Sequence, residues 1–157
     1  MSLNAAAKGA VAGLAGAALM TVTEKVEQRL TGRPDSFVPG RALLGLLGRR
    51  PAESARPEGW NLAMHYGTAA ALGVLRGVWA ELGLRGPTWS AAHTVVRLST
   101  DQTVENATGV GAPPHAWPGL ERRVDVLHKA VYSAVTGWLA DRMVPERSRP
   151  LPGRFSH

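Results

Sequence analysis

Residues 9–23 read GAVAGLAGAALMTVT, an uncharged run of 15 residues built largely from small side chains. Glycine and alanine recur in this run four residues apart, as Gly9-xxx-Gly13 and Ala12-xxx-Gly16, and the pattern returns later as Gly73-xxx-Gly77. Residues four apart lie on one face of a helix, so these spacings let two helix backbones approach closely. The run therefore predicts a helix that packs tightly against others through its small residues.

The whole chain shares this composition, with 24 alanines and 18 glycines among its 157 residues but no cysteine and no isoleucine. The scarcity of aromatic and β-branched residues argues against an all-β fold. The lack of cysteine excludes a disulfide scaffold, a thiol nucleophile and a zinc ribbon. The net charge of +6 comes without a basic stripe or a nucleic-acid motif, so we expect no nucleic-acid partner.

Glycine and proline divide the chain into helical segments. We expect a short amphipathic helix over residues 41–48 and four long helices, over residues 4–30, 60–84, 89–108 and 120–144. Short connections make successive helices antiparallel. The predicted fold is all-α: a four-helix antiparallel bundle embedded in a membrane, with residues 1–144 as one domain and residues 145–157 as a disordered tail rich in arginine and proline.

The sequence carries opposing indications about the membrane. No apolar run reaches the roughly 18 residues expected of a spanning helix, which favours a buried helix in a water-soluble bundle. The small-residue spacings, together with Trp60, Trp89 and Trp117 near segment starts, are typical of bilayer proteins. We expect a small integral membrane protein with lipid as its partner, present as a homo-oligomer or within a larger complex, in a transport, stress-related or accessory role. A cytoplasmic bundle is the alternative.

Antiparallel helices bring polar residues from four segments to one end of the predicted bundle. These residues are Glu24, Glu27, His65, Asp101, Glu105, Asp125 and His128. Carboxylates with neutral imidazoles suit Fe, Mn or Zn, and Asp125-x-x-His128 has the spacing of a ligand pair in carboxylate-bridged dimetal bundles. Two interpretations stay open: a transition-metal site, as in a helical metalloprotein or oxidoreductase, and a metal-free ion-pair network with a structural or proton-handling use.

Secondary polar candidates lie inside the long segments, namely Arg76, His93, Arg97 and Tyr132. A cation in the middle of a membrane helix needs a carboxylate partner, such as Asp101 or Glu81, and usually marks function. His93 is expected at the opposite end from the cluster. Because the chain has neither a phosphate-binding loop nor a nucleophile elbow, we predict no specific reaction. A soluble interaction module, binding through residues 42–47 or the tail, is a third alternative.

Several short motifs together resemble a known family. They are His65-Tyr66-Gly67 with Gly73 and Gly77, Gly86-Pro87 with His93, GVGAPP at residues 109–114, and DVLHKAVYSAVTG at residues 125–137. Over residues 8–144 the chain resembles the small, uncharacterised YagU-like bacterial membrane proteins. The resemblance implies a four-helix protein of the inner (cytoplasmic) membrane with no established activity, so it carries no catalytic residues. The chain departs from the pattern in its fourth segment, where Arg97, Asp101 and Glu105 put full spanning in doubt.

Overall fold

The computed structural model describes residues 2–147, a range that contains five α-helices, one 3-10 turn and no strand. The elements are α1 (Leu3–Thr31), α2 (Val38–Leu46), α3 (Glu58–Glu81), α4 (Pro87–Thr108), η1 (Pro114–Ala116) and α5 (Gly119–Met143). The prediction of an all-α fold with four long helices and one short helix is confirmed. Most of the predicted disordered tail, residues 148–157, lies outside the described residues.

Local chemistry sets the helix ends. The Ser2 hydroxyl accepts a hydrogen bond from the Ala5 N–H at 3.1 Å and caps α1. Gly32 ends that helix with φ of 72°, a left-handed conformation that favours glycine. Helix α4 begins at Pro87, two residues before the predicted start, because proline at the first helical position loses no intrahelical hydrogen bond.

Helices α1 and α3 run antiparallel with their backbones in contact. Gly9 and Gly13 of α1 lie against Gly73 and Gly77 of α3, and a Cβ atom added to Gly9 would lie 2.9 Å from the Gly77 Cα. A Cβ added to Gly13 would lie equally close to the Gly73 Cα. Real side chains do not tolerate such distances, so this interface requires glycine. The prediction that small residues four apart mediate helix packing is confirmed here.

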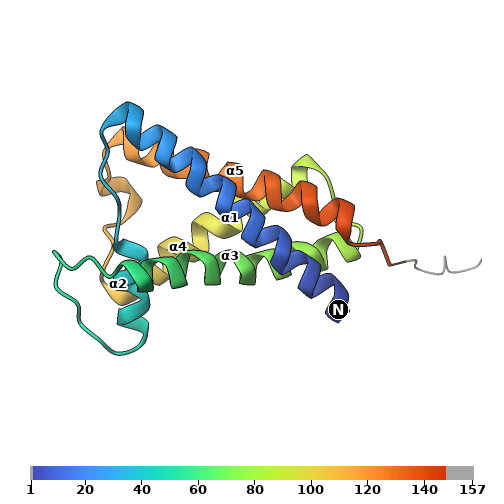
Figure 1. The fold of residues 1–157 in the computed structure, drawn as a ribbon, viewed down its shortest axis with the longest axis horizontal. Helices are drawn as coiled ribbons and strands as arrows, with labels where there is room; N and C mark the ends of the chain where they lie inside the picture. Colours follow the sequence, from blue (N-terminus) through green and yellow to red (C-terminus); the bar gives the residue numbers. More distant parts are fainter. Residues whose placement is uncertain (1, 148–157) are drawn as a thin grey trace, which may run out of the picture.

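Helix α5 packs against α1, α3 and α4, while α2 packs against α3 and α4 at one end of the bundle (Figure 1). The Gly40 N–H of α2 donates to the Asn61 Oδ1 at 2.9 Å, which fixes α2 on the first turn of α3. Gly45 of α2 lies against Thr108, the last residue of α4. Helix α2 therefore closes the end of the bundle between the start of α3 and the end of α4.

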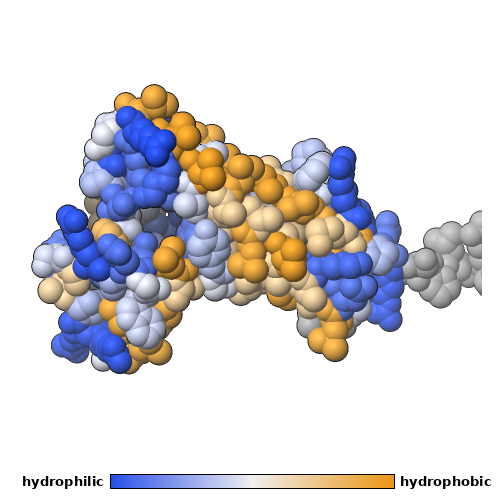
Figure 2. Space-filling model, viewed as in Figure 1, coloured by the Kyte–Doolittle hydropathy of each residue, from blue (hydrophilic) through white to orange (hydrophobic). Residues whose placement is uncertain are grey.

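Large apolar side chains are exposed along the long helices. Examples are Val11 (55% exposed) and Val22 on α1, Val95 (61%) on α4, and Leu127 and Trp138 on α5. Figure 2 shows apolar residues gathered over the middle of the molecule on this face, with hydrophilic residues toward both ends. Several charged and polar side chains are instead buried, among them Arg76, Arg97 and Lys129. The middle of the bundle thus has an apolar outside and a partly polar inside.

Candidate functional site

The structure places the seven predicted cluster residues at the end of the bundle that α2 closes, but it divides them into separate groups. Glu24 and Glu27 pair with Arg33, at 3.5 and 2.9 Å. The Arg33 guanidinium lowers the pKa of the Glu27 carboxyl, which also accepts a hydrogen bond from Thr31. This first group lies at the end of α1, where it fastens the following loop to the helix.

His65 and His128 approach the bundle from different helices. The His65 Nε2 lies 3.2 Å from the Thr21 hydroxyl of α1, so this imidazole bridges α3 and α1. His128 is buried on α5. The predicted Asp125-x-x-His128 pair lies on one turn of α5, but the Asp125 carboxylate pairs with Lys129.

Lys129 joins α4 and α5 through a chain of alternating charges. The Lys129 Nζ lies 2.7 Å from Asp125 Oδ1 and 3.3 Å from Asp101 Oδ2. Asp101 Oδ2 also accepts a hydrogen bond from the Arg97 Nε at 2.9 Å. Arg97 and Lys129 are both buried, while Asp101 and Asp125 are partly buried, so two cations and two carboxylates neutralise one another where screening by water is reduced.

The transition-metal site predicted from the cluster is not formed within residues 2–147, where no group of three or more His, Cys, Asp or Glu side chains could hold a metal ion. The physical reason is competition from cations of the chain itself. Lys129 engages the two aspartates, and Arg33 engages Glu24 and Glu27. The ion-pair alternative therefore describes these residues better than the Fe, Mn or Zn alternative.

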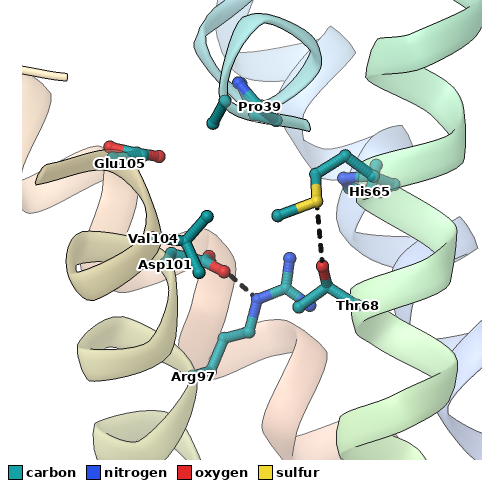
Figure 3. A pocket seen from close by; sticks show the side chains of 9 residues that line it. Pro39, His65, Thr68, Arg97, Asp101, Val104 and Glu105 are labelled. Carbon is teal, nitrogen blue, oxygen red and sulfur yellow. Dashed lines mark hydrogen bonds and ion pairs between the residues drawn. The ribbon is translucent and has the colours of Figure 1, made fainter. Parts of the chain in front are cut away.

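A small cavity of about 30 Å³ lies between α2, α3 and α4 (Figure 3). Its lining consists of Pro39, Ala42, Met64, His65, Thr68, Arg97, Asp101, Val104 and Glu105. Arg97 reaches from α4 toward Thr68 of α3, with Asp101 beside it and Glu105 on the next turn. The Arg97 Nη1 is buried and meets no hydrogen-bond acceptor in the described part of the chain. A cavity of this size and polarity accommodates a water molecule.

A buried stack of side chains adjoins this cavity and consists of Arg97, Tyr132 and His93. The Arg97 guanidinium carbon lies 5.0 Å from the centre of the Tyr132 ring, and the His93 ring stacks on the same tyrosine at 5.5 Å. The Tyr132 hydroxyl donates to the Ala69 carbonyl at 2.7 Å. His93 Nε2 lies 3.0 Å from the Leu72 carbonyl, and because a carbonyl only accepts, this nitrogen carries the proton. His93 is thus fully buried on α4, one helical turn before Arg97 and on the side of α4 away from Asp101 and Glu105 along the helix.

Arg76 has a carboxylate partner other than the two predicted ones. It is fully buried on α3 and pairs with Asp141 of α5 at 2.9 Å. The Gly86 N–H also donates to Asp141, at 2.9 Å. Of the predicted partners, Asp101 pairs with Arg97 and Glu81 accepts hydrogen bonds from the Ser2 N–H. A second ion pair thus lies toward the other end of the bundle.

Three residues of α5 that contribute polar groups to the interior were missed at the level of sequence: Lys129, Ser133 and Asp141. Lys129 and Ser133 lie four residues apart on one buried face of α5, so helical periodicity was an available signal for these two. Asp141 belongs to the interior through its ion pair with Arg76 of α3. Together with Thr136, Asp125, Arg97, Asp101, His93, Tyr132 and Arg76 they form what we call the polar seam, which runs through the interior of the bundle along α4, α5 and the facing part of α3, from Asp125 to Asp141.

No protein-family model, no curated protein and no solved structure matches the chain. The resemblance to YagU-like proteins therefore stays a prediction. The function has to be argued from the polar seam, the cavity and the apolar exterior.

Proposed function

We propose that this chain is a small membrane-spanning helical bundle whose polar seam serves the passage of protons or another small polar species. The spanning ranges are residues 9–23 of α1, 59–80 of α3, 87–104 of α4 and 124–140 of α5. At about 1.5 Å per residue these ranges are about 22–33 Å long, close to the roughly 30 Å of a bilayer's hydrocarbon core.

The observation that carries the membrane location is the direction in which charged side chains point. Within the four ranges the charged residues are Arg76, Arg97, Asp101, Asp125 and Lys129, and none of them belongs to the exposed class. The exposed positions in these ranges are uncharged, and many are Val, Leu or Ala. A water-soluble bundle places its charges on the outside, whereas lipid favours the reverse.

Helix hydropathy alone gives weaker support. Among the described residues, α1 is the one helix long and apolar enough to span by itself, and the core helix of a water-soluble protein passes the same test. Hydropathy averaged over α3, α4 or α5 includes inward charges that lipid would not contact. The exposure pattern is therefore the better criterion for these three helices.

The polar seam supports the transport part of the proposal. Ionisable residues within a membrane are costly and typically mark ion or proton pathways. Within residues 2–147, several buried polar atoms of the seam lack a hydrogen-bond partner: Arg76 Nε, His93 Nδ1, Arg97 Nη1, Ser133 Oγ and Thr136 Oγ1. Buried polar groups are usually satisfied by protein or by ordered water. The seam thus offers sites for water between the charge chain around Asp101 and the Arg76–Asp141 pair.

Fractionation of expressing cells tests the membrane location. We expect the protein in the membrane pellet, resistant to high salt and alkaline carbonate, and soluble once detergent is added. A matched variant, Val95→Asp, places one charge on the apolar exterior and should reduce the membrane-bound yield, whereas Val95→Leu should not. Recovery of the wild-type protein in the supernatant without detergent would contradict the proposal.

Proton flux into liposomes tests the transport role. Purified protein is reconstituted with a trapped pH-sensitive dye, and a pH step is applied with valinomycin and potassium to balance charge. We expect faster dye quenching than in empty liposomes, and slower quenching with Arg97→Gln or Thr136→Val than with the exterior control Val126→Ala. Quenching equal to that of empty liposomes would assign the seam a structural role only.

A further inference from the structure

A second hollow lies on the outside of the bundle, in the groove between α4 and α5. Its volume is about 570 Å³, and its lining consists of Gly86, Pro87, Ser90, Ala91, Thr94, Ala130, Ala134, Trp138 and Asp141. The groove stays open because small residues line both of its walls, Ala91 on α4 and Ala130 and Ala134 on α5. Its size falls in the range of about 300–1,000 Å³ that is typical of small-molecule sites.

The groove opens onto the apolar exterior of the proposed spanning ranges. Ala91, Ala134 and Trp138 belong to both the lining and the exposed surface. In a bilayer, a hollow in this position faces hydrocarbon chains. An acyl chain is flexible enough to follow a narrow groove between two helices, and most of the lining that it would contact is apolar.

One end of the groove is cationic. Arg142 follows the lining residue Asp141 and is exposed, with its guanidinium carbon 4.0 Å from the centre of the Trp138 ring. Asp141 does not cancel this charge, because it is already paired with Arg76 at 2.9 Å. Helix α4 also begins here without a side-chain cap, and a helix start carries a partial positive charge. The groove therefore joins an apolar trough to a positively charged rim.

We propose that this groove binds one acyl chain of an anionic phospholipid, with the headgroup phosphate at Arg142. The proposal rests on the membrane location argued above. Charge favours this occupant over a second copy of the chain, since the chain carries a net charge of +6 and a copy placed head to head would bring a like-charged rim to Arg142. Trp138, with its ring stacked on Arg142, is placed as interfacial tryptophans are, between hydrocarbon and headgroups.

Native mass spectrometry of the detergent-purified protein tests the groove, with phosphatidylglycerol and phosphatidylcholine of equal chain length as probes. We expect one retained lipid per chain and a preference of about fivefold for the anionic lipid, the effect of one arginine near a membrane surface. Ala134→Phe fills the groove and should abolish retention of both lipids. Arg142→Gln should remove the preference and leave retention at the phosphatidylcholine level.

The control is Val95→Phe, which adds the same bulk to the exterior of α4 outside the groove lining and should retain lipid like the wild-type protein. Each variant is used only if its thermal melt in detergent matches that of Val95→Phe. Retention by Ala134→Phe equal to the control would overturn the proposal, as would a change from oligomer to monomer without loss of lipid, which would identify a second copy as the occupant. These failures leave a protein that still pellets with membranes, whereas failure of the proposed function would appear as recovery without detergent.

Discussion

Two helix interfaces in this bundle are built in opposite ways. Between α1 and α3, four glycines bring the backbones together, and the Glu81 carboxylate meets the start of α1 only at the end of this interface, where it accepts from the Ser2 N–H. Between α4 and α5, the contacts on the inner side are polar and aromatic: Lys129 pairs with Asp101, and the His93 ring stacks on Tyr132. The comparison separates two tasks: α1 and α3 form a closely packed support, and α4 and α5 carry the polar seam.

Breaking the ion-pair chain should have the largest effect. Asp101→Ala leaves Arg97 and Lys129 buried without their shared carboxylate, and an uncompensated buried charge costs about 3–5 kcal/mol. We expect the free energy of unfolding in detergent, measured by chemical denaturation, to fall by about this amount. The control Asp35→Ala removes an exposed pair with Lys25 and should cost at most about 1 kcal/mol. Equal effects of the two substitutions would show that burial adds nothing to the Asp101 pairs.

The glycine interface should be broken by a single methyl group. In Gly73→Ala, the new Cβ would meet backbone atoms of Gly9 and Gly13, so α1 and α3 must separate at a cost of about 1–3 kcal/mol. Gly67→Ala, on the same helix, meets nothing within 4 Å and should stabilise α3 by up to about 1 kcal/mol. Thermal melts of the two variants should therefore shift in opposite directions. A shared direction would contradict the close approach of the helices.

The Tyr132 hydroxyl tests how much one hydrogen bond of the polar seam contributes to stability. Tyr132→Phe removes the hydrogen bond to the Ala69 carbonyl and leaves the ring stack with His93 in place, so we expect a loss of about 1 kcal/mol in unfolding free energy. Tyr66→Phe is the matched control, because Tyr66 packs beside the same core without that bond. Equal denaturation midpoints for the two variants would assign no stabilisation to the bond.

The smallest effect is expected from the ion pair at the end of α1. The pKa of Glu27 is lowered by Arg33, so the folded state binds its proton less readily than the unfolded state. This contribution to stability is present above the ordinary glutamate pKa of about 4.3 and is lost as the pH falls through the lower pKa of the folded state. The melting temperature of the wild-type protein should therefore fall more between pH 5 and pH 3, at roughly equal salt, than that of Glu27→Gln.

The packing of α1 against α3 could be predicted from the sequence better than the pairing of residues in the polar seam. The spacing of Gly9, Gly13, Gly73 and Gly77 is itself the packing signal, because glycine has no side chain whose direction must be known. Helix direction likewise predicted which residues share an end of the bundle. The sequence did not predict which charged side chains pair with one another. Asp125 has His128 three residues away and Lys129 four away, and only the fold shows that Lys129 also reaches Asp101.

The partner of Arg76 shows why the rest was out of reach. Asp141 lies 65 residues further along the chain, and nothing in the local pattern of either helix connects them. Two nearer carboxylates were plausible partners, yet each is taken by another group. Which carboxylate pairs with Arg76 depends on how each helix is rotated about its own axis. Each residue turns a helix by about 100°, so an error of one residue in alignment is enough to change the partner.

The same pair has a consequence for how the protein is made. Synthesis proceeds from the N-terminus, so α3 leaves the ribosome with Arg76 long before Asp141 exists. Until α5 arrives, α3 would present an uncompensated guanidinium to the lipid. Under the proposed membrane location, insertion of α3 into the bilayer would therefore have to wait for the C-terminal helix. A chain truncated before Asp141 should then be recognised by quality-control proteases, even though α1, α3 and their glycine contacts are complete.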